Sequence, residues 1–287
     1  MTWIDAPYLR ARLLHRENDS HKGDYGHLLV VAGCQSMPWA AVLATGAALR
    51  SGCGLVTLHS TRRALQAAVV CCPSAMLSED PGEAFSRLPV SLDRYTAVAV
   101  GPGLGMLPET KDALLKLLSE VKERRLPAVL DADALNILSG IPDWRDHVPM
   151  GSALTPHLGE LRRLFSWKED AERDRQVQEL CASTGCVLVV KGFHTKVFTP
   201  DGTCLVNTTG NPGLAKGGSG DVLTGLLGGL LARSYATADA AALAVWLQGR
   251  AGDLLTEART AEAWSSLDLL DVLYKGFVEL YDGEDRG

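Results

Sequence analysis

Residues 207–229 read NTTGNPGLAKGGSGDVLTGLLGG, a glycine-dense segment that changes from a polar loop to a helical pattern at Asp221. After Asp221, leucines recur at the spacing of one helical face: Leu223, Leu226, Leu227, Leu230 and Leu231. Small residues separate them: Thr224, Gly225, Gly228, Gly229 and Ala232. Because glycine costs about 0.5–1 kcal/mol inside a helix, this ridge predicts a packing reason, the close approach of a second helix.

Residues 217–220 (GGSG) stand directly before this helix and predict a binding site for an anion. Free backbone N–H groups at a helix start, with the helix dipole behind them, suit phosphate. A carboxylate beside such a site cannot be the phosphate ligand, because like charges repel. We therefore interpret Asp221 as a base that takes a proton from a hydroxyl brought up to the phosphate. The alternative is a plain glycine loop, with Asp221 as an ordinary acid of the first helical turn.

The overall composition is typical of a soluble globular protein, with 287 residues, 46% hydrophobic and 22% charged. A net charge of −6 argues against nucleic acid or an anionic membrane surface as partner. The longest apolar run, 222–232, is far below the ~20 residues of a membrane span. Seven cysteines without a C-x-x-C pair, and an N-terminus without a signal-peptide pattern, predict reduced thiols and a cytoplasmic protein.

Apolar strand patterns alternate with helical patterns along the chain. The expected strands cover 27–33, 55–60, 97–100, 127–130, 152–155 and 187–190. The expected helices between them include 40–51, 61–70 and 109–124. A hairpin is expected where 195–199 and 203–206 flank Pro200-Asp201-Gly202. This alternation predicts an α/β fold with a mostly parallel central sheet flanked by helices, and a single domain over residues 1–287.

Glycines and polar residues gather where each expected strand ends. They are Gly33, His59, Gly101–Gly105, Asp131, Asp133, Thr155–Glu160 and Lys191-Gly192. Parallel sheets bind ligands beyond the carboxyl ends of their strands, so this edge is predicted to be the rim of the active site. The alternative is that loop residues fall there by chance. The sequence contains no G-x-G-x-x-G, Walker, H-E-x-x-H or G-x-S-x-G motif.

Six blocks in order resemble one family over nearly the whole chain. They are HKGDYGHLLVVAG (21–33), GPGLG (101–105), LDADALN (130–136), LTPHLGE (154–160), VVKGFHT (189–195) and NTTGNPGLAKGGSGDVLTG (207–225). The sequence resembles the ADP/ATP-dependent NAD(P)H-hydrate dehydratases, carbon–oxygen lyases of the ribokinase-like superfamily. The resemblance implies a cofactor-repair enzyme that uses ADP or ATP and Mg²⁺ to dehydrate hydrated NADH or NADPH, by phosphorylating the hydroxyl and eliminating phosphate. It also implies a homo-oligomer.

The resemblance implies a role for each matching residue. Asp221 would be the base, and Gly218, Ser219 and Gly220 would stabilise the transferred phosphoryl group. The nucleotide contacts would be Lys191, Gly192, Phe193, His194, Thr195, Asn207 and Gly220. The substrate contacts would be Ala41, Gly103, His157 and Asp221. Glu160 would have a magnesium-linked role through water. For Asp131 and Asp133 two roles stay open, one at the metal and one at the helix start.

Two residues depart from the family pattern. Trp39 stands where the family usually has glycine, and Leu158 where it usually has proline. Trp39 is expected to reshape the nicotinamide pocket. The alternative functions are a small-molecule kinase of the same superfamily, which stops at the phosphate ester, and a non-catalytic nucleotide-binding protein. The preference for ADP or ATP, and for NADH or NADPH hydrate, is left open.

Overall fold

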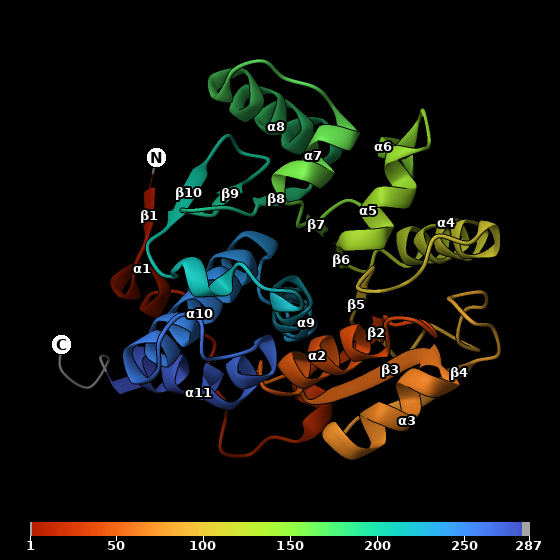
Figure 1. The fold of residues 1–287 in the computed structure, drawn as a ribbon, viewed down its shortest axis with the longest axis horizontal. Coiled ribbons are helices and arrows are strands. Elements are labelled where there is room, and N and C mark those ends of the chain that lie inside the picture. Colours follow the sequence, from red (N-terminus) through yellow and green to blue (C-terminus); the bar gives the residue numbers. More distant parts are fainter. Residues whose placement is uncertain (1, 283–287) are drawn as a thin grey trace.

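In the computed structural model, which describes residues 2–282, ten strands form one continuous sheet (Figure 1). Their order is β1-β10-β9-β8-β7-β6-β5-β2-β3-β4. The strands are β1 (Thr2–Ile4), β2 (His27–Val31), β3 (Leu55–Thr61), β4 (Met76–Asp80), β5 (Ala97–Val100), β6 (Ala128–Leu130), β7 (Ala153–Leu154), β8 (Val187–Val190), β9 (Lys196–Phe198) and β10 (Cys204–Asn207). Only β9 runs antiparallel to its neighbours, β8 and β10. The mostly parallel sheet and the 195–206 hairpin are confirmed.

Helices cover both faces of the sheet, and each face has its own apolar core (Figure 1). One face carries α1 (Ala6–Arg10), α2 (Pro38–Leu49), α3 (Arg62–Cys71), α9 (Ser219–Ala232), α10 (Thr237–Ala258) and α11 (Ser266–Asp282). The other carries α4 (Pro108–Glu123), α5 (Ala132–Ser139), α6 (Trp144–His147), α7 (Leu158–Leu164) and α8 (Asp170–Thr184). None of the helices in the described part of the chain is long and apolar enough to cross a membrane.

Helix α9 packs backbone to backbone against α2. A Cβ atom on Gly225 would lie 1.8 Å from the carbonyl oxygen of Ala44, and one on Gly229 would lie 2.0 Å from Ser51 Oγ. No side chain fits into gaps of this size, so glycine is required at both positions. On the sheet side, a Cβ on Gly228 would lie 2.8 Å from that of Ala99. The close helix contact predicted from the small residues of 224–232 is confirmed.

Two edge strands lie outside the sequence prediction. Strand β1 pairs in parallel with β10, and β4 pairs in parallel with β3. Strand β4 reads MLSED and is half-exposed, so it lacks the apolar run that identified the buried strands. Edge strands have a neighbour on one side only and commonly carry charged residues. The pattern rules for buried parallel strands therefore do not apply to them.

Candidate active site

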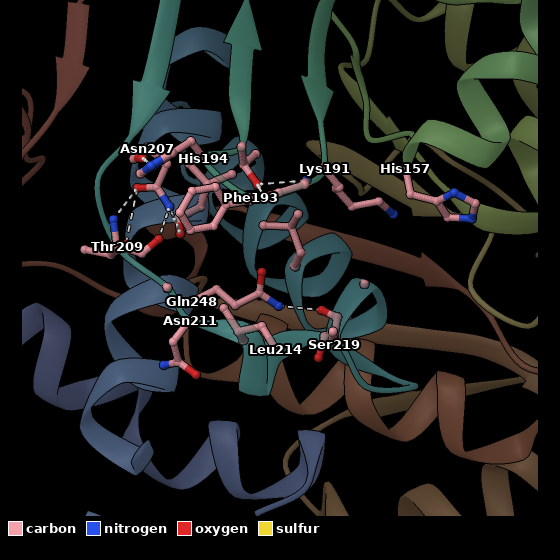
Figure 2. Close-up of a pocket in the computed structure, with 18 of the residues that line it drawn as sticks. His157, Lys191, Phe193, His194, Asn207, Thr209, Asn211, Leu214, Ser219 and Gln248 are labelled. Atoms are coloured by element: carbon pink, nitrogen blue, oxygen red, sulfur yellow. Dashed lines mark hydrogen bonds between the residues drawn. The ribbon is translucent and has the colours of Figure 1, made fainter. Parts of the chain in front are cut away.

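The carboxyl ends of the parallel strands open into a cavity of about 760 Å³ (Figure 2). Its wall is built from Asp131 after β6, from His157 and Glu160 in the loop and helix after β7, and from the segment 191–195 after β8. The segment 207–216 and the first turn of α9 complete it. Part of the predicted rim, from Asp131 to Lys191-Gly192, is therefore a concavity in which segments far apart in sequence meet, whereas Gly33, His59 and Gly101–Gly105 do not line it.

The glycine loop places unpaired backbone amides at the start of α9. Gly218 is the N-cap residue in the left-handed region, with φ +91°, and a Cβ there would lie 2.5 Å from Leu43 Cδ1. Within residues 2–282, the amides of Gly220 and Asp221 donate no hydrogen bond, whereas the amide of Ser219 donates to the Lys216 carbonyl at 3.3 Å. Two free donors with the helix dipole behind them form a cradle for an anion.

Two side chains fix the other face of this loop. Ser266 Oγ donates to the carbonyl of Gly217 at 2.7 Å, and the amide of Gln248 donates to the carbonyl of Ser219 (Figure 2). Ser266 Oγ also lies 3.2 Å from Ser219 Oγ. Because hydrogen bonds fix these two carbonyls on the side away from the cavity, the neighbouring backbone amides are held facing the cavity. Neither Gln248 nor Ser266 was predicted from the sequence.

Asp221 lies on the first turn of α9, directly after the cradle. Burial, the largest effect, and the adjacent negative charge of Asp131 raise the pKa of Asp221 to about 6, while Lys191 opposes the rise. An acid with this pKa is ionised at neutral pH yet holds a proton more readily than a surface aspartate. This is the property that a general base needs.

Lys191 is the cation of the site, at the end of β8. Its ammonium group lies 2.7 Å from Asp131 Oδ1 and 3.8 Å from Glu160 Oε2. The other oxygen of Asp131 accepts a hydrogen bond from Thr224 Oγ1 at 2.7 Å. Burial disfavours the charge on Lys191, but Asp131 and Glu160 outweigh it, so the pKa of Lys191 is raised above its usual value. The ammonium group therefore stays charged beside the cavity.

Asp131 and Asp133, whose roles the sequence left open, make different contacts in the structure. Asp131, only 1% exposed, is the buried counter-ion of Lys191. Asp133 Oδ2 accepts the backbone amide of Gly105 at 2.9 Å and so fixes the GPGLG loop. Asp131 occupies the N-cap position of α5, yet its side chain makes no capping bond. The helix-start interpretation is therefore wrong for the Asp131 carboxylate.

His157 and Glu160 bind each other across the start of α7. His157 Nδ1 accepts the amides of Gly159 and Glu160, and Glu160 Oε2 accepts the amide of His157 at 2.8 Å. Among the described residues, no group of three or more His, Cys, Asp or Glu side chains could hold a metal ion. Magnesium commonly takes one or two carboxylates and completes its shell with phosphates and water. The buried Glu160 carboxylate fits that donor chemistry, so its metal-linked role stays a prediction.

The segment 192–195 forms the outer lip of the cavity. Phe193 is 85% exposed, and its ring centroid lies 4.1 Å from that of His194. Thr195 Oγ1 donates to the Gly192 carbonyl at 3.2 Å and closes the turn. The side chain of Asn207 lies next to His194 and donates to the carbonyls of Thr209 and Val245, so it holds the wall of the cavity in place (Figure 2).

Two of the expected substrate contacts, His157 and Asp221, line the cavity, whereas Ala41 and Gly103 lie around the start of α2 and outside its lining. Ala41 is fully buried, and its contact with the substrate stays a prediction. Gly103 has φ +57°, and a Cβ there would lie 2.8 Å from that of Ala40. The exposed side chains here are Met37 and Trp39, at 43% and 53%. Trp39 is therefore at the surface beside Met37, and its expected effect on the nicotinamide pocket stays a prediction.

Comparison with known proteins gives a consistent result. A family model described as NAD(P)H-hydrate dehydratase matches residues 28–275. The chain is 39% identical to a bifunctional NAD(P)H-hydrate repair enzyme from Moorella thermoacetica, over 94% of this chain and 52% of the relative. The chain thus spans about half the length of that relative.

Two crystal structures share the fold over almost the whole chain. One is the ADP/ATP-dependent NAD(P)H-hydrate dehydratase from Bacillus subtilis, co-crystallised with ATP and Mg²⁺; it has 31% identity and a TM-score of 0.83, covering 97% of this chain and 98% of the other. The second is a ribokinase-like superfamily protein from Enterococcus faecalis, with 25% identity and a TM-score of 0.83, covering 97% and 96%. The expected ribokinase-like fold is confirmed.

Proposed function

Because this chain belongs to the NAD(P)H-hydrate dehydratase family, we propose that it repairs hydrated NADH and NADPH, using ADP or ATP as phosphoryl donor. One observation carries the proposal. Asp221, whose pKa is raised to about 6, lies in the helical turn that presents the free amides of Gly220 and Asp221 to a cavity of about 760 Å³. A proton acceptor and a phosphate cradle therefore meet at one point.

The reaction begins when the carboxylate of Asp221 takes the proton from the hydroxyl of the hydrate. The freed oxygen attacks the terminal phosphorus of the nucleotide, and the bond from that phosphorus to the nucleotide breaks. The backbone amides at the start of α9 stabilise the charge on the transferred group; a donor of this kind is worth about 2.7–4 kcal/mol in comparable sites. The ring nitrogen then expels the phosphate, a proton leaves the adjacent ring carbon, and the dihydronicotinamide is restored.

The remaining residues bind and orient the nucleotide. Lys191 supplies a cation that Asp131 and Glu160 hold in position. Phe193 and His194 offer ring faces at the outer lip, where a purine can stack. Magnesium, held through water by Glu160, would neutralise charge on the phosphates. Asn207 and Thr195 keep the lip in shape and are positioning groups for the nucleotide.

The experiment mixes purified protein and Mg²⁺ with hydrated NADH or NADPH, and with ADP or ATP. Recovery of dihydronicotinamide absorbance, with release of inorganic phosphate, is the expected result. A stable phosphorylated product instead of recovered cofactor would identify a kinase that stops at the ester. Binding without turnover for every pair of substrates would refute an enzymatic function. The direct comparison of ADP with ATP decides the donor.

We also propose a cytoplasmic homo-oligomer, by analogy with the family. Sedimentation equilibrium at micromolar protein concentration measures the number of subunits, and fractionation of the source cells measures the location. A monomer, or recovery in the membrane fraction, would contradict the respective statement.

A further inference from the structure

One wall of the active-site cavity, formed by residues 207–216, lies directly against helix α10. A Cβ atom on Gly249 would lie 2.2 Å from Thr209 Oγ1, and one on Gly252 would lie 3.0 Å from Leu214 Cγ. Thr209 and Leu214 both line the cavity. Because two glycines of α10 admit the wall so closely, polar groups on the same helix come within hydrogen-bonding distance of it.

The carboxylate of Asp253 on α10 holds this wall by two hydrogen bonds. Its Oδ2 accepts the backbone amide of Gly210 at 2.9 Å, and its Oδ1 accepts the side-chain amide of Asn211 at 2.9 Å. Gly210 has φ +103°, so the bond restrains a residue with an unusually wide choice of conformations. Asn211 lies across the cavity from Phe193 (Figure 2). Asp253 itself does not line the cavity, so it can affect a ligand only through the wall.

Asn211 extends this restraint along the wall. Its side-chain oxygen accepts the amide of Gly213 at 2.9 Å and the hydroxyl of Thr256 at 3.0 Å. The Thr256 hydroxyl in turn accepts the indole N–H of Trp264 at 3.1 Å. The hydrogen bonds from Trp264 through Thr256 and Asn211 therefore all donate in one direction, toward Asp253. The last member of such a chain has to accept without donating, and an ionised carboxylate does so.

The glycine loop at the start of α9 is held by other contacts. The ammonium group of Lys216 donates to the carbonyl of Ala261 at 2.6 Å and to the carbonyl of Trp264. It also lies 4.2 Å from the centroid of the Trp264 ring. None of these bonds is made to Asp253, so a change at Asp253 is expected to loosen the wall at 210–213 and to leave the amides of α9 in place.

We propose that Asp253 is a positioning residue for nucleotide binding, which holds 210–213 in the one conformation that the nucleotide binds. The inference rests on the proposed function, because it adds a residue to the nucleotide site. Without the carboxylate, the wall divides its population among several conformations, and the apparent Kd rises in inverse proportion to the competent fraction. A competent fraction of about one tenth raises the Kd about tenfold. The chemical step at Asp221 is unchanged once the nucleotide is bound.

The first variant is Asp253→Asn, which has almost the same shape. Its amide oxygen can accept the bond from Gly210, but its N–H groups then face those of Asn211. Turning over the Asn211 amide only moves the unpaired donor to Gly213. Calorimetric titration and steady-state kinetics are expected to show Kd and KM for ADP or ATP raised about tenfold. The kcat and the KM for the hydrate are expected to stay within about twofold of the wild type.

The second variant exchanges the two partners, as Asn211→Asp/Asp253→Asn. Residue 253 then donates to residue 211 instead of accepting from it, and every hydrogen bond of the network has a donor and an acceptor again. The Kd for nucleotide is expected to return to within about twofold of the wild type. The matched control is Glu257→Gln, which removes the same charge from α10 at a carboxylate that pairs with Arg250, and which should leave the Kd unchanged.

Amide hydrogen exchange in the ligand-free proteins provides a readout without nucleotide. Exchange at Gly210 and Gly213 is expected to be about tenfold faster in Asp253→Asn than in the wild type, and to be slow again in the exchanged pair. Faster exchange at an unchanged Kd for ADP would make Asp253 a merely structural residue and overturn the proposal, as would an exchanged pair whose Kd stays raised. If the wild type binds ADP in an Asp253-dependent way but turns over neither hydrate, the proposed function fails and this inference stands.

Discussion

Replacing Asp221 with asparagine is expected to stabilise the protein while abolishing its activity. The pKa of Asp221 is raised from the ordinary value of 3.8 to about 6, mainly through burial. Between these pH values, the folded protein holds a proton that the unfolded chain has released. The free energy of unfolding therefore falls as pH rises from about 4 to about 6, and the full cost of the buried charge is present above pH 6.

The size of this cost follows from the same two pKa values. At 1.36 kcal/mol per pKa unit, the charge of Asp221 costs about 3 kcal/mol at pH 8. Asp221→Asn removes the charge, so its free energy of unfolding should exceed that of the wild type by up to about 3 kcal/mol at pH 8 and by almost nothing at pH 4.

Guanidinium titrations of both proteins at several pH values measure this difference. Asp112→Asn is the matched control, because Asp112 lies on the exposed side of α4. A difference between Asp221→Asn and the wild type that does not change with pH would refute the reasoning, since a lost contact has no such pH dependence. The variant should also lose turnover by about 10²–10⁴-fold at unchanged nucleotide affinity; full activity would remove the assignment of the base.

Four further predictions concern the site and its scaffold. The value of kcat/KM should fall about tenfold per pH unit below about pH 6, as Asp221 becomes protonated; a flat profile from pH 4.5 to 7 would contradict this. Lys191→Met should raise the KM for nucleotide and destabilise the fold by about 3–5 kcal/mol, because it leaves Asp131 buried without its partner; adding Asp131→Asn should restore the melting temperature but not the KM. Ser266→Ala should lower kcat about tenfold by freeing the carbonyl of Gly217, while Ser266→Thr retains activity. Gly225→Ala should prevent folding or lower the free energy of unfolding by more than about 4 kcal/mol, because its Cβ would lie 1.8 Å from the Ala44 carbonyl oxygen. The control is Gly140→Ala, which should be tolerated because the atom nearest to its Cβ is 3.5 Å away.

The sequence predicted those features whose cause is local. The glycine loop and the helix that follows it share one short segment, so spacing alone indicated an anion cradle beside Asp221. Lys191 was identified because it ends an apolar strand, and parallel strands end at the same edge. The close approach of a second helix to α9 was predicted because small residues separate its leucines, whereas the identity of that helix, α2, was not.

The residues that the sequence did not reveal act across long separations. Gln248 contacts the glycine loop from 29 positions away, and Thr224 contacts Asp131 from 93. Their types are ordinary for a helix, and no local pattern marks which helical face meets which loop. Likewise, the place of Ala41 in a familiar block did not reveal that helix packing buries it completely, and its contact with the substrate stays a prediction. Such facts depend on tertiary contacts, which periodicity does not encode.

The glycine contact between α2 and α9 has a mechanical consequence. Two backbones in direct contact leave no deformable side-chain layer, so neither helix can slide or tilt without the other. Helix α2 begins at Pro38 and carries Trp39 in its first turn, and the first turn of α9 carries the amides of Gly220 and Asp221. In the proposed reaction we therefore expect the rigid scaffold to set the separation between the attacking oxygen and the phosphorus, without closure of a lid.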